Sequence, residues 1–209
     1  TVIAVMAGCL SAGLSMRDAA HFANHAAGVV VAKLGTASVS PEELSTAVSA
    51  APAGPADNVL AETILASVLE DLRAAGQRIV MTNGCFDLIH PGHVRYLQQA
   101  RALGDALVVA VNDDDSVRRL KGERRPVNTL DDRIAVLAAL GAVDYAVSFS
   151  EDTPARLIEA LAPDVLVKGG DYAVEQIAGH ESVLARGGEV RVLDFVDGHS
   201  TSGLIERLN

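Results

Sequence analysis

The sequence comprises 209 residues, of which 49% are apolar, and carries a formal net charge of −10. This length allows one well-buried domain, or one domain with an appendage, and the composition excludes a disordered chain. An acidic chain disfavours non-specific binding to nucleic acid or to an anionic membrane, so we expect small molecules as partners. A local basic site could still hold a phosphorylated ligand.

The chain has two cysteines, Cys9 and Cys85, whose spacing fits neither a metal site nor a disulfide framework. The expected compartment is therefore a reducing cytoplasm. The apolar start of the chain lacks a basic leader and is too short to span a bilayer. Because the chain does not begin with Met and begins within a predicted helix, we expect it to be the C-terminal part of a longer protein.

The first 76 residues show helical and linker patterns. Residues 1 to about 40 predict two helical stretches, because Ala and Val recur at helical spacing. Residues 38–57 contain three prolines and many small residues, which is typical of a surface linker with one short helix starting at Pro41. A further helix should end at Gly76. Its apolar positions repeat every four residues: Leu60, Ile64, Val68 and Leu72.

From Arg78 onward, short β-branched runs alternate with amphipathic helical stretches, which predicts a parallel sheet covered by helices. The predicted strands are 79–82, 106–112, 143–149, 164–169 and 189–195. The predicted helices are 92–104, 115–120, 129–140, 153–162, 173–186 and 201–208, the third with Thr129 as N-cap and with Ile134, Leu137 and Leu140 on one side. We therefore expect an α/β domain with a doubly wound five-stranded parallel sheet, which binds ligands beyond the C-terminal strand ends at the switch point of strand order.

The most specific pattern is the turn from the first strand to the next helix, between Met81 and His93. His90 and His93 lie across a Pro-Gly step at a helix N-terminus, where both rings and backbone N–H groups can face an anion. Gly92 lets a phosphate approach the main chain. Histidines near a helix start are common, but this pair with its glycine, directly after the first strand, favours a phosphate site. A metal site is disfavoured because the remaining ligands are missing.

Two other segments could bind phosphate. Residues 118–125 are strongly basic in an otherwise acidic chain, and a solvated basic loop is the alternative interpretation. Four polar residues lie at the start of the last predicted helix, whose N-terminus can hold phosphate, although an ordinary N-cap needs only one hydroxyl. They are His199, Ser200, Thr201 and Ser202.

The segment HPGH after GCFD, together with HSTSGLIERL near the C-terminus, resembles the cytidylyltransferase-like nucleotidyltransferase superfamily. The stretches TNGCFDLIHPGHVRYL, VNDDDSVRRLKGERRPVN and DVLVKGGDY are similar to the adenylyltransferase domain of the bifunctional ADP-heptose synthase family, over roughly residues 77–209. That resemblance implies a Rossmann-like domain that transfers AMP from ATP, in the presence of Mg²⁺, to D-glycero-β-D-manno-heptose 1-phosphate. The products would be ADP-heptose, used for lipopolysaccharide, and pyrophosphate.

Residues 1–44 resemble the last helices of a ribokinase-like sugar kinase, the domain that comes first in that family. The resemblance implies three segments: a kinase remnant at 1–44, a linker and helix at 45–76, and the nucleotidyltransferase domain at 77–209. The Gly-Ala-Gly-Asp motif of such kinases normally stands before this remnant. We therefore do not expect the chain itself to phosphorylate heptose.

The resemblance also implies roles for individual residues. The expected catalytic residues are His90, His93 and Lys121. The expected nucleotide-binding residues are Asn83, Gly84, Cys85, Phe86, Gly92, Lys168, Gly169, His199, Ser200, Thr201 and Ser202. The candidate substrate residues are Asp87, Asp113 and Asp171, with helix capping as an equal alternative at Asp113. Cys85 should be a small buried residue rather than an activated thiolate. His199 departs from the isoleucine of many members, which leaves its role open.

Two alternatives remain. The chain could resemble a glycerol-3-phosphate cytidylyltransferase that uses CTP, or it could be an inactive nucleotide-binding or assembly module. The preference for ATP rests on the resemblance, because adenine is usually recognised by backbone groups and loop shape. The family tends to self-associate, so we expect a homo-oligomer.

Overall fold

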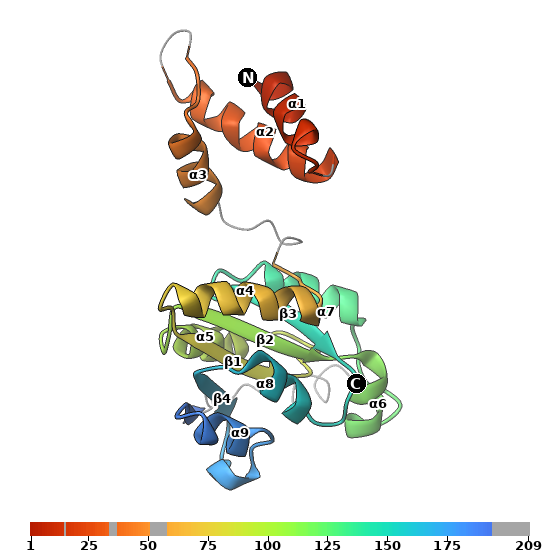
Figure 1. Cartoon of the computed structure of the whole chain (residues 1–209). Coiled ribbons are helices and arrows are strands. Elements are labelled where there is room, and N and C mark those ends of the chain that lie inside the picture. The colour runs from red at the N-terminus through yellow and green to blue at the C-terminus, as the bar shows by residue number, and fades with distance from the viewer. Residues whose placement is uncertain (15, 34–36, 51–57, 194–209) are drawn as a thin grey trace. The chain divides into compact units, whose positions relative to one another are not determined.

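The structure is a computed structural model of the chain, and it describes residues 1–14, 16–33, 37–50 and 58–193. The chain forms two compact units, Thr1–Pro52 and Ala53–Asn209 (Figure 1). The described part of the first unit contains helices α1 (Val2–Ser11), α2 (Met16–Val31) and α3 (Pro41–Ala50). The two helical stretches expected before residue 40 and the helix expected at Pro41 are confirmed. None of the helices described is long and apolar enough to cross a membrane.

The second unit is built on a five-stranded sheet in which all pairs of strands are parallel. Its strands are β1 (Ile79–Gly84), β2 (Ala106–Asn112), β3 (Tyr145–Phe149), β4 (Val165–Gly169) and β5 (Glu189–Leu193). Their order is β3-β2-β1-β4-β5, so the chain builds outward from β1 on one side and then crosses to the other (Figure 1). This order confirms the doubly wound sheet, although the last two residues predicted for the fifth strand lie outside the described residues.

Helices cover both faces of the sheet. Helices α4 (Glu62–Ala74), α8 (Ala155–Leu161) and α9 (His180–Ala185) pack on one face, where their buried apolar side chains form a core with strand residues such as Met81. Helices α5 (Pro91–Arg101) and α7 (Leu130–Ala138) pack on the other face with Val80 and Val109. Because both faces are covered, every residue of β2 is buried. Helix α6 (Asp114–Lys121) follows β2.

The apolar stripe predicted for α4 is confirmed in part, because Leu60 and Leu72 pack against the core, but it is wrong at Ile64. Leu65 and Leu69 are fully buried against the sheet, whereas Ile64 is 56% exposed. A step of four residues advances roughly 400° around a helix of 3.6 residues per turn, so a stripe of repeated fours drifts away from the core. The predicted cap at Gly76 is confirmed, because Gly76 has φ 77° and Gln77 N–H donates to the Leu72 carbonyl at 3.0 Å.

The single helix predicted for residues 173–186 is also wrong. A short 3₁₀ helix, η1 (Val174–Gln176), is followed by α9, which begins only at His180. Between them Ile177 is buried and Gly179 has φ 86°, a conformation that ends a right-handed helix. The helix predicted for 129–140 is confirmed, with the Thr129 hydroxyl accepting from Asp132 N–H, and that predicted for 201–208 lies outside the described residues.

Candidate active site

The carboxyl ends of β1 and β4 lie at the switch point of the sheet, because the chain leaves β1 toward β2 and later returns to β1's other side. Here the structure brings together two of the predicted nucleotide-binding residues. Lys168 Nζ, at the end of β4, donates to Asn83 Oδ1 at 3.1 Å and to the Asn83 carbonyl at 3.3 Å. Burial lowers the pKa of the Lys168 ammonium, and the charge of Lys121 lowers it further. A cation held in this way is ready for an anionic ligand.

The predicted histidine pair stands at the start of α5. His90 is the N-cap residue, Pro91 occupies the first helical position, and Gly92 is buried. The rings of His90 and His93 are stacked, with centroids 3.9 Å apart and an interplanar angle of 27°. Burial and the neighbouring His90 lower the pKa of His93 to about 4, so His93 is uncharged at neutral pH. Its buried Nδ1 has no hydrogen-bond partner among the described residues.

A tight turn between β1 and α5 holds the ring of His93. Phe86 has φ 47°, which is uncommon outside glycine, and its buried ring lies 5.4 Å from the His93 ring at 60°. Gly84 accommodates that ring, since a Cβ at Gly84 would come within 3.1 Å of Phe86 Cε2. Strained backbone of this kind is concentrated at functional sites. The turn thus explains why these predicted residues occur together in the sequence.

The basic segment after β2 contains several arginines that form ion pairs and, among the described residues, a lysine that forms none. Arg118 pairs with Asp115, and Arg119 pairs with Asp152 at 2.7 Å, all of them largely exposed. Lys121 ends α6 and has no ion pair within the described part of the chain. Its charge acts on both Cys85 and Lys168, so it lies close to the ends of β1 and β4. The geometry therefore favours Lys121 over these two arginines as the cation that faces the site.

Cys85 lies at the same strand ends without the features of a reactive thiol. Burial raises the pKa of its thiol, and the nearby cations only partly offset that effect. Its Sγ lies 4.0 Å from Asn112 Oδ1, a weak contact. These observations agree with the expectation that Cys85 is not an activated thiolate.

The predicted substrate residues are mostly occupied by contacts within the protein. The buried Asp87 carboxylate accepts hydrogen bonds from Val127 N–H at 2.8 Å and Asn128 N–H at 3.0 Å, and forms an ion pair with Arg125. Burial opposes its ionisation, but these hydrogen bonds outweigh burial and lower the pKa of Asp87. Asp113 caps α6 by accepting from Ser116 N–H at 2.7 Å. We therefore place both aspartates in the framework of the site and no longer among the candidate ligands.

Asp171 is exposed beyond the end of β4, and Gly169 ends that strand. The predicted residues His199, Ser200, Thr201 and Ser202 lie outside the described residues. Within the described ranges, no group of three or more His, Cys, Asp or Glu side chains could hold a metal ion.

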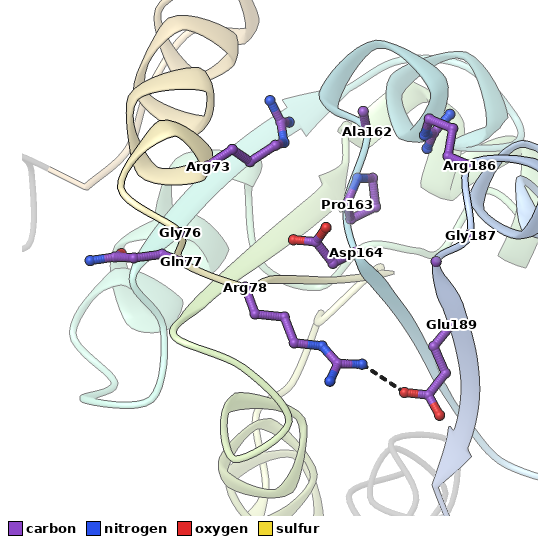
Figure 2. Close-up of a pocket in the computed structure, with 11 residues that line it drawn as sticks. Arg73, Gly76, Gln77, Arg78, Ala162, Pro163, Asp164, Arg186, Gly187 and Glu189 are labelled. Atoms are coloured by element: carbon purple, nitrogen blue, oxygen red, sulfur yellow. Dashed lines mark hydrogen bonds and ion pairs between the residues drawn. The ribbon is translucent and has the colours of Figure 1, made fainter.

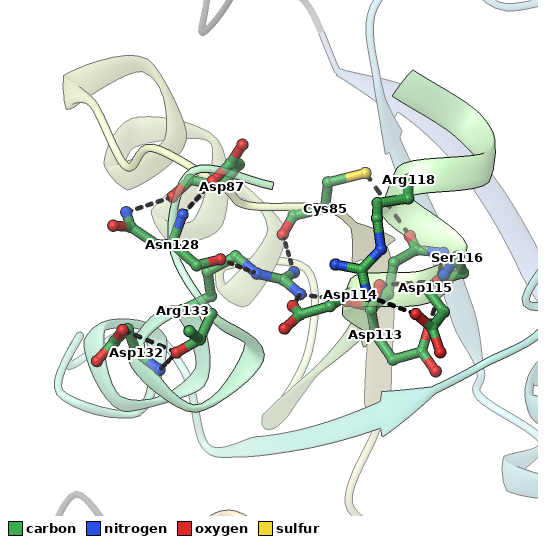
Figure 3. Close-up of polar contacts among 12 residues, drawn as sticks. Cys85, Asp87, Asp113, Asp114, Asp115, Ser116, Arg118, Asn128, Asp132 and Arg133 are labelled. Atoms are coloured by element: carbon green, nitrogen blue, oxygen red, sulfur yellow. Dashed lines mark hydrogen bonds and ion pairs between the residues drawn. The ribbon is translucent and has the colours of Figure 1, made fainter. Parts of the chain in front are cut away.

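Sequence reasoning missed Arg133, which lies at the centre of this framework (Figure 3). Its side chain is fully buried, and its guanidinium donates to four oxygen atoms: the carbonyls of Cys85, Asn112 (2.7 Å) and Asn128 (3.2 Å), and Asp114 Oδ1 (2.9 Å). One pattern could have revealed it. Arg133 stands next to Ile134 and four residues before Leu137, on the face predicted to be buried, where an arginine requires buried acceptors.

A cavity of about 650 Å³ lies at the opposite edge of the sheet, at the amino ends of β1, β4 and β5 (Figure 2). Three arginines line it, but its carboxylates are already engaged. Glu189 pairs with Arg78 at 2.8 Å, and Asp164 Oδ2 accepts from Ile79 N–H at 2.7 Å. Because ligands of doubly wound sheets bind beyond the carboxyl ends of strands, we place the active site at the histidine pair and not in this cavity.

The fold and the segment from Cys85 to His93, here called the histidine turn, define the class of this protein. The model of the cytidylyltransferase-like family matches residues 81–207, and the chain belongs to that family. It is 61% identical over its whole length to the bifunctional protein HldE of Halorhodospira halophila and 60% identical to that of Methylococcus capsulatus. The chain spans 44% of the length of each. The crystal structure of a lipopolysaccharide core biosynthesis protein from Thermoplasma volcanium is 30% identical, with a TM-score of 0.47, over 58% of this chain and 98% of that one.

Proposed function

We propose that this chain transfers AMP from ATP to D-glycero-β-D-manno-heptose 1-phosphate, giving ADP-heptose and pyrophosphate. The observation that carries nucleotidyl transfer is the stacked His90–His93 pair at the N-terminus of α5, which follows β1, with Lys168 bound to Asn83 at the end of the same strand. The choice of ATP and heptose rests on the resemblance of residues 77–209 to the ADP-heptose synthase family. Similarity over the whole chain to proteins named bifunctional protein HldE supports the same family.

The reaction needs no covalent intermediate. An oxygen of the sugar phosphate attacks the α-phosphorus of ATP in line, and the bond from that phosphorus to the bridging oxygen breaks as pyrophosphate leaves. The protein therefore has to align two anions and neutralise the charge that builds on the phosphoryl oxygens. His90 and His93 would donate to the α-phosphate, Lys121 and Lys168 would neutralise the phosphate chain, and Ser200 to Ser202 would hold the pyrophosphate end. Mg²⁺ would enter with ATP, bound mainly by its phosphates.

The remaining parts of the proposal concern the longer protein. We propose that residues 1–44 are the end of a ribokinase-like domain and do not phosphorylate heptose by themselves. We also propose that the enzyme works in the cytoplasm as a homo-oligomer on small molecules, without nucleic acid or membrane. Its two free cysteines support a reducing compartment.

A pyrophosphate-release assay on the 209-residue chain tests the function. ATP and CTP are each offered with heptose 1-phosphate and with glycerol 3-phosphate. We expect turnover with ATP and heptose 1-phosphate, and a loss of about 10²-fold or more in the His93→Ala variant, the scale of one oriented donor. Turnover only with CTP and glycerol 3-phosphate would establish the cytidylyltransferase alternative. Nucleotide binding without turnover on any pair would establish the inactive module.

A further inference from the structure

Arg133 joins segments of the chain that come from both sides of the candidate site. Its guanidinium holds the Cys85 carbonyl, in the turn that leads from β1 to the histidine pair. It also holds Asp114 Oδ1, in the first turn of the helix that ends at Lys121. One rigid, planar group therefore sets the spacing between the histidine turn and the helix that carries the lysine.

The loop before α7 is fastened both to Arg133 and to the turn that carries Asp87. Asn128 gives its carbonyl to Arg133 at 3.2 Å, while its backbone N–H donates to Asp87 Oδ1 at 3.0 Å and its side-chain amide donates to the Asp87 carbonyl at 2.8 Å. Asp87 lies in the histidine turn, two residues after Cys85. The network is thus closed, because the loop is joined to the turn in two ways: through Arg133, and directly through Asp87 (Figure 3).

An arginine at this position is a poor choice for stability alone. Its side chain is fully buried and its single carboxylate partner, Asp114, is 32% exposed. Removing a guanidinium from water costs several kcal/mol, and apolar side chains of similar volume often stabilise such sites equally well or better. Arg133 also lies on α7 next to Ile134 and Leu137, which belong to the apolar core. What only the guanidinium supplies is simultaneous donation to acceptors on separate segments.

We propose that Arg133 is a positioning residue for nucleotidyl transfer, which sets the place of Lys121 relative to the His90–His93 pair. It acts through the Cys85 carbonyl and Asp114 and does not touch the substrate. Lys121 ends the helix whose first turn carries Asp114, and Arg133 connects that turn to the Cys85 carbonyl. This inference rests on the proposed function for the identity of the reaction.

A double-mutant cycle on the 209-residue chain tests the coupling. Arg133→Met should lower kcat by about 30-fold or more in the wild-type background, since an oriented charge would be misplaced. In the Lys121→Met background the same substitution should lower kcat less than about threefold, because the misplaced group is already absent. Equal losses in both backgrounds would show a general structural role and overturn the proposal.

Arg101 provides the matched control. It is also an arginine with several contacts, to the Gly104 carbonyl at 2.6 Å and to Asp144 at 2.6 Å, but it lies at the far end of α5. Arg101→Met should reduce kcat by the same factor with and without Lys121. Coupling to Lys121 as large as that of Arg133 would mean that any loss of packing produces the effect, and would also overturn the proposal.

Two further measurements keep the test decisive. If Arg133→Met does not fold, Asp114→Asn replaces it, because this nearly isosteric change removes the negative charge that Arg133 pairs with on α6 and should couple to Lys121 in the same direction. If the wild-type chain shows no turnover, the proposed function fails, and the cycle is read from the affinity for ATP by titration calorimetry. Additive losses of affinity would then overturn the positioning role separately.

Discussion

Binding of a phosphate at the histidine turn should draw a proton onto His93. In the free protein, burial and His90 lower its pKa to about 4, and its Nδ1 has no partner among the described residues. At pH 6.5 this pKa leaves roughly 0.3% of His93 protonated. An anion at the N-terminus of α5 favours the charged form and raises the pKa of His93, so binding at pH 6.5 should draw up to about one proton per chain.

The same shift fixes the direction of a pH effect on folding. The folded pKa of His93 lies below the ordinary value of 6.5, so the unfolded chain takes up the extra proton. The contribution to stability is therefore fully present above pH 6.5 and is lost as the pH falls toward 4. The shift corresponds to roughly 3 kcal/mol, and partial exposure of the ring to solvent reduces this to about 1–2 kcal/mol.

Titration calorimetry with pyrophosphate at pH 6.5, in buffers of different ionisation enthalpy, measures the proton uptake. The matched variant is His93→Gln, and protonation of pyrophosphate itself cancels in the difference. We expect the wild-type chain to take up more protons than the variant, by at most about one per chain. An equal uptake by both proteins, or a His93 that titrates above pH 6 in the free chain, would refute the reasoning.

Two other substitutions separate binding from folding. Lys168→Met should weaken ATP binding by roughly 10- to 100-fold because a charged hydrogen-bond donor is lost, while the free energy of unfolding should stay the same or rise by about 1 kcal/mol because burial of the ammonium is relieved. Parallel ATP titration and urea unfolding measure both, and a large loss of stability would contradict this prediction. Leu69→Ala should lower the unfolding free energy by about 2–5 kcal/mol, whereas Ile64→Ala on the exposed side of α4 should lower it by less than roughly 0.5 kcal/mol. If urea unfolding showed equal losses of unfolding free energy for the two variants, Ile64 would contribute to the core as the sequence predicted.

The sheet could be predicted from the sequence because each strand is a compact β-branched run with a helical stretch after it. A doubly wound sheet buries both faces of its strands, so the runs stand out. The stripe of α4 could not be placed, because several apolar residues compete on that helix and only the position of the sheet selects Leu65 and Leu69. The break at Gly179 depends likewise on a tertiary contact, since a Cβ at this position would come within 2.8 Å of Ile158 Cδ1.

The residues of the candidate site could likewise be predicted only in part. His90, His93 and Lys168 were predicted because their chemistry at strand ends points to phosphate. The family resemblance implied that Asp87 binds substrate, yet a carboxylate can serve equally well as an acceptor for a loop. Which of these it does depends on Arg125 and Asn128, some forty residues later in the chain. Contacts at that distance leave little trace in a single sequence.

The central place of β1 has a consequence for how this chain can vary in length. Its residues are paired in register with β2 from Ile79 to Gly84 and with β4 from Val80 to Thr82. One residue inserted into β1 would turn its side chains to the opposite faces or break both ladders, and would carry the histidine turn with it. Changes in length are therefore confined to surface connections such as the one at the exposed Gly141, between α7 and β3. Tags and reporter peptides for work on this protein belong in such connections, outside residues 79–93.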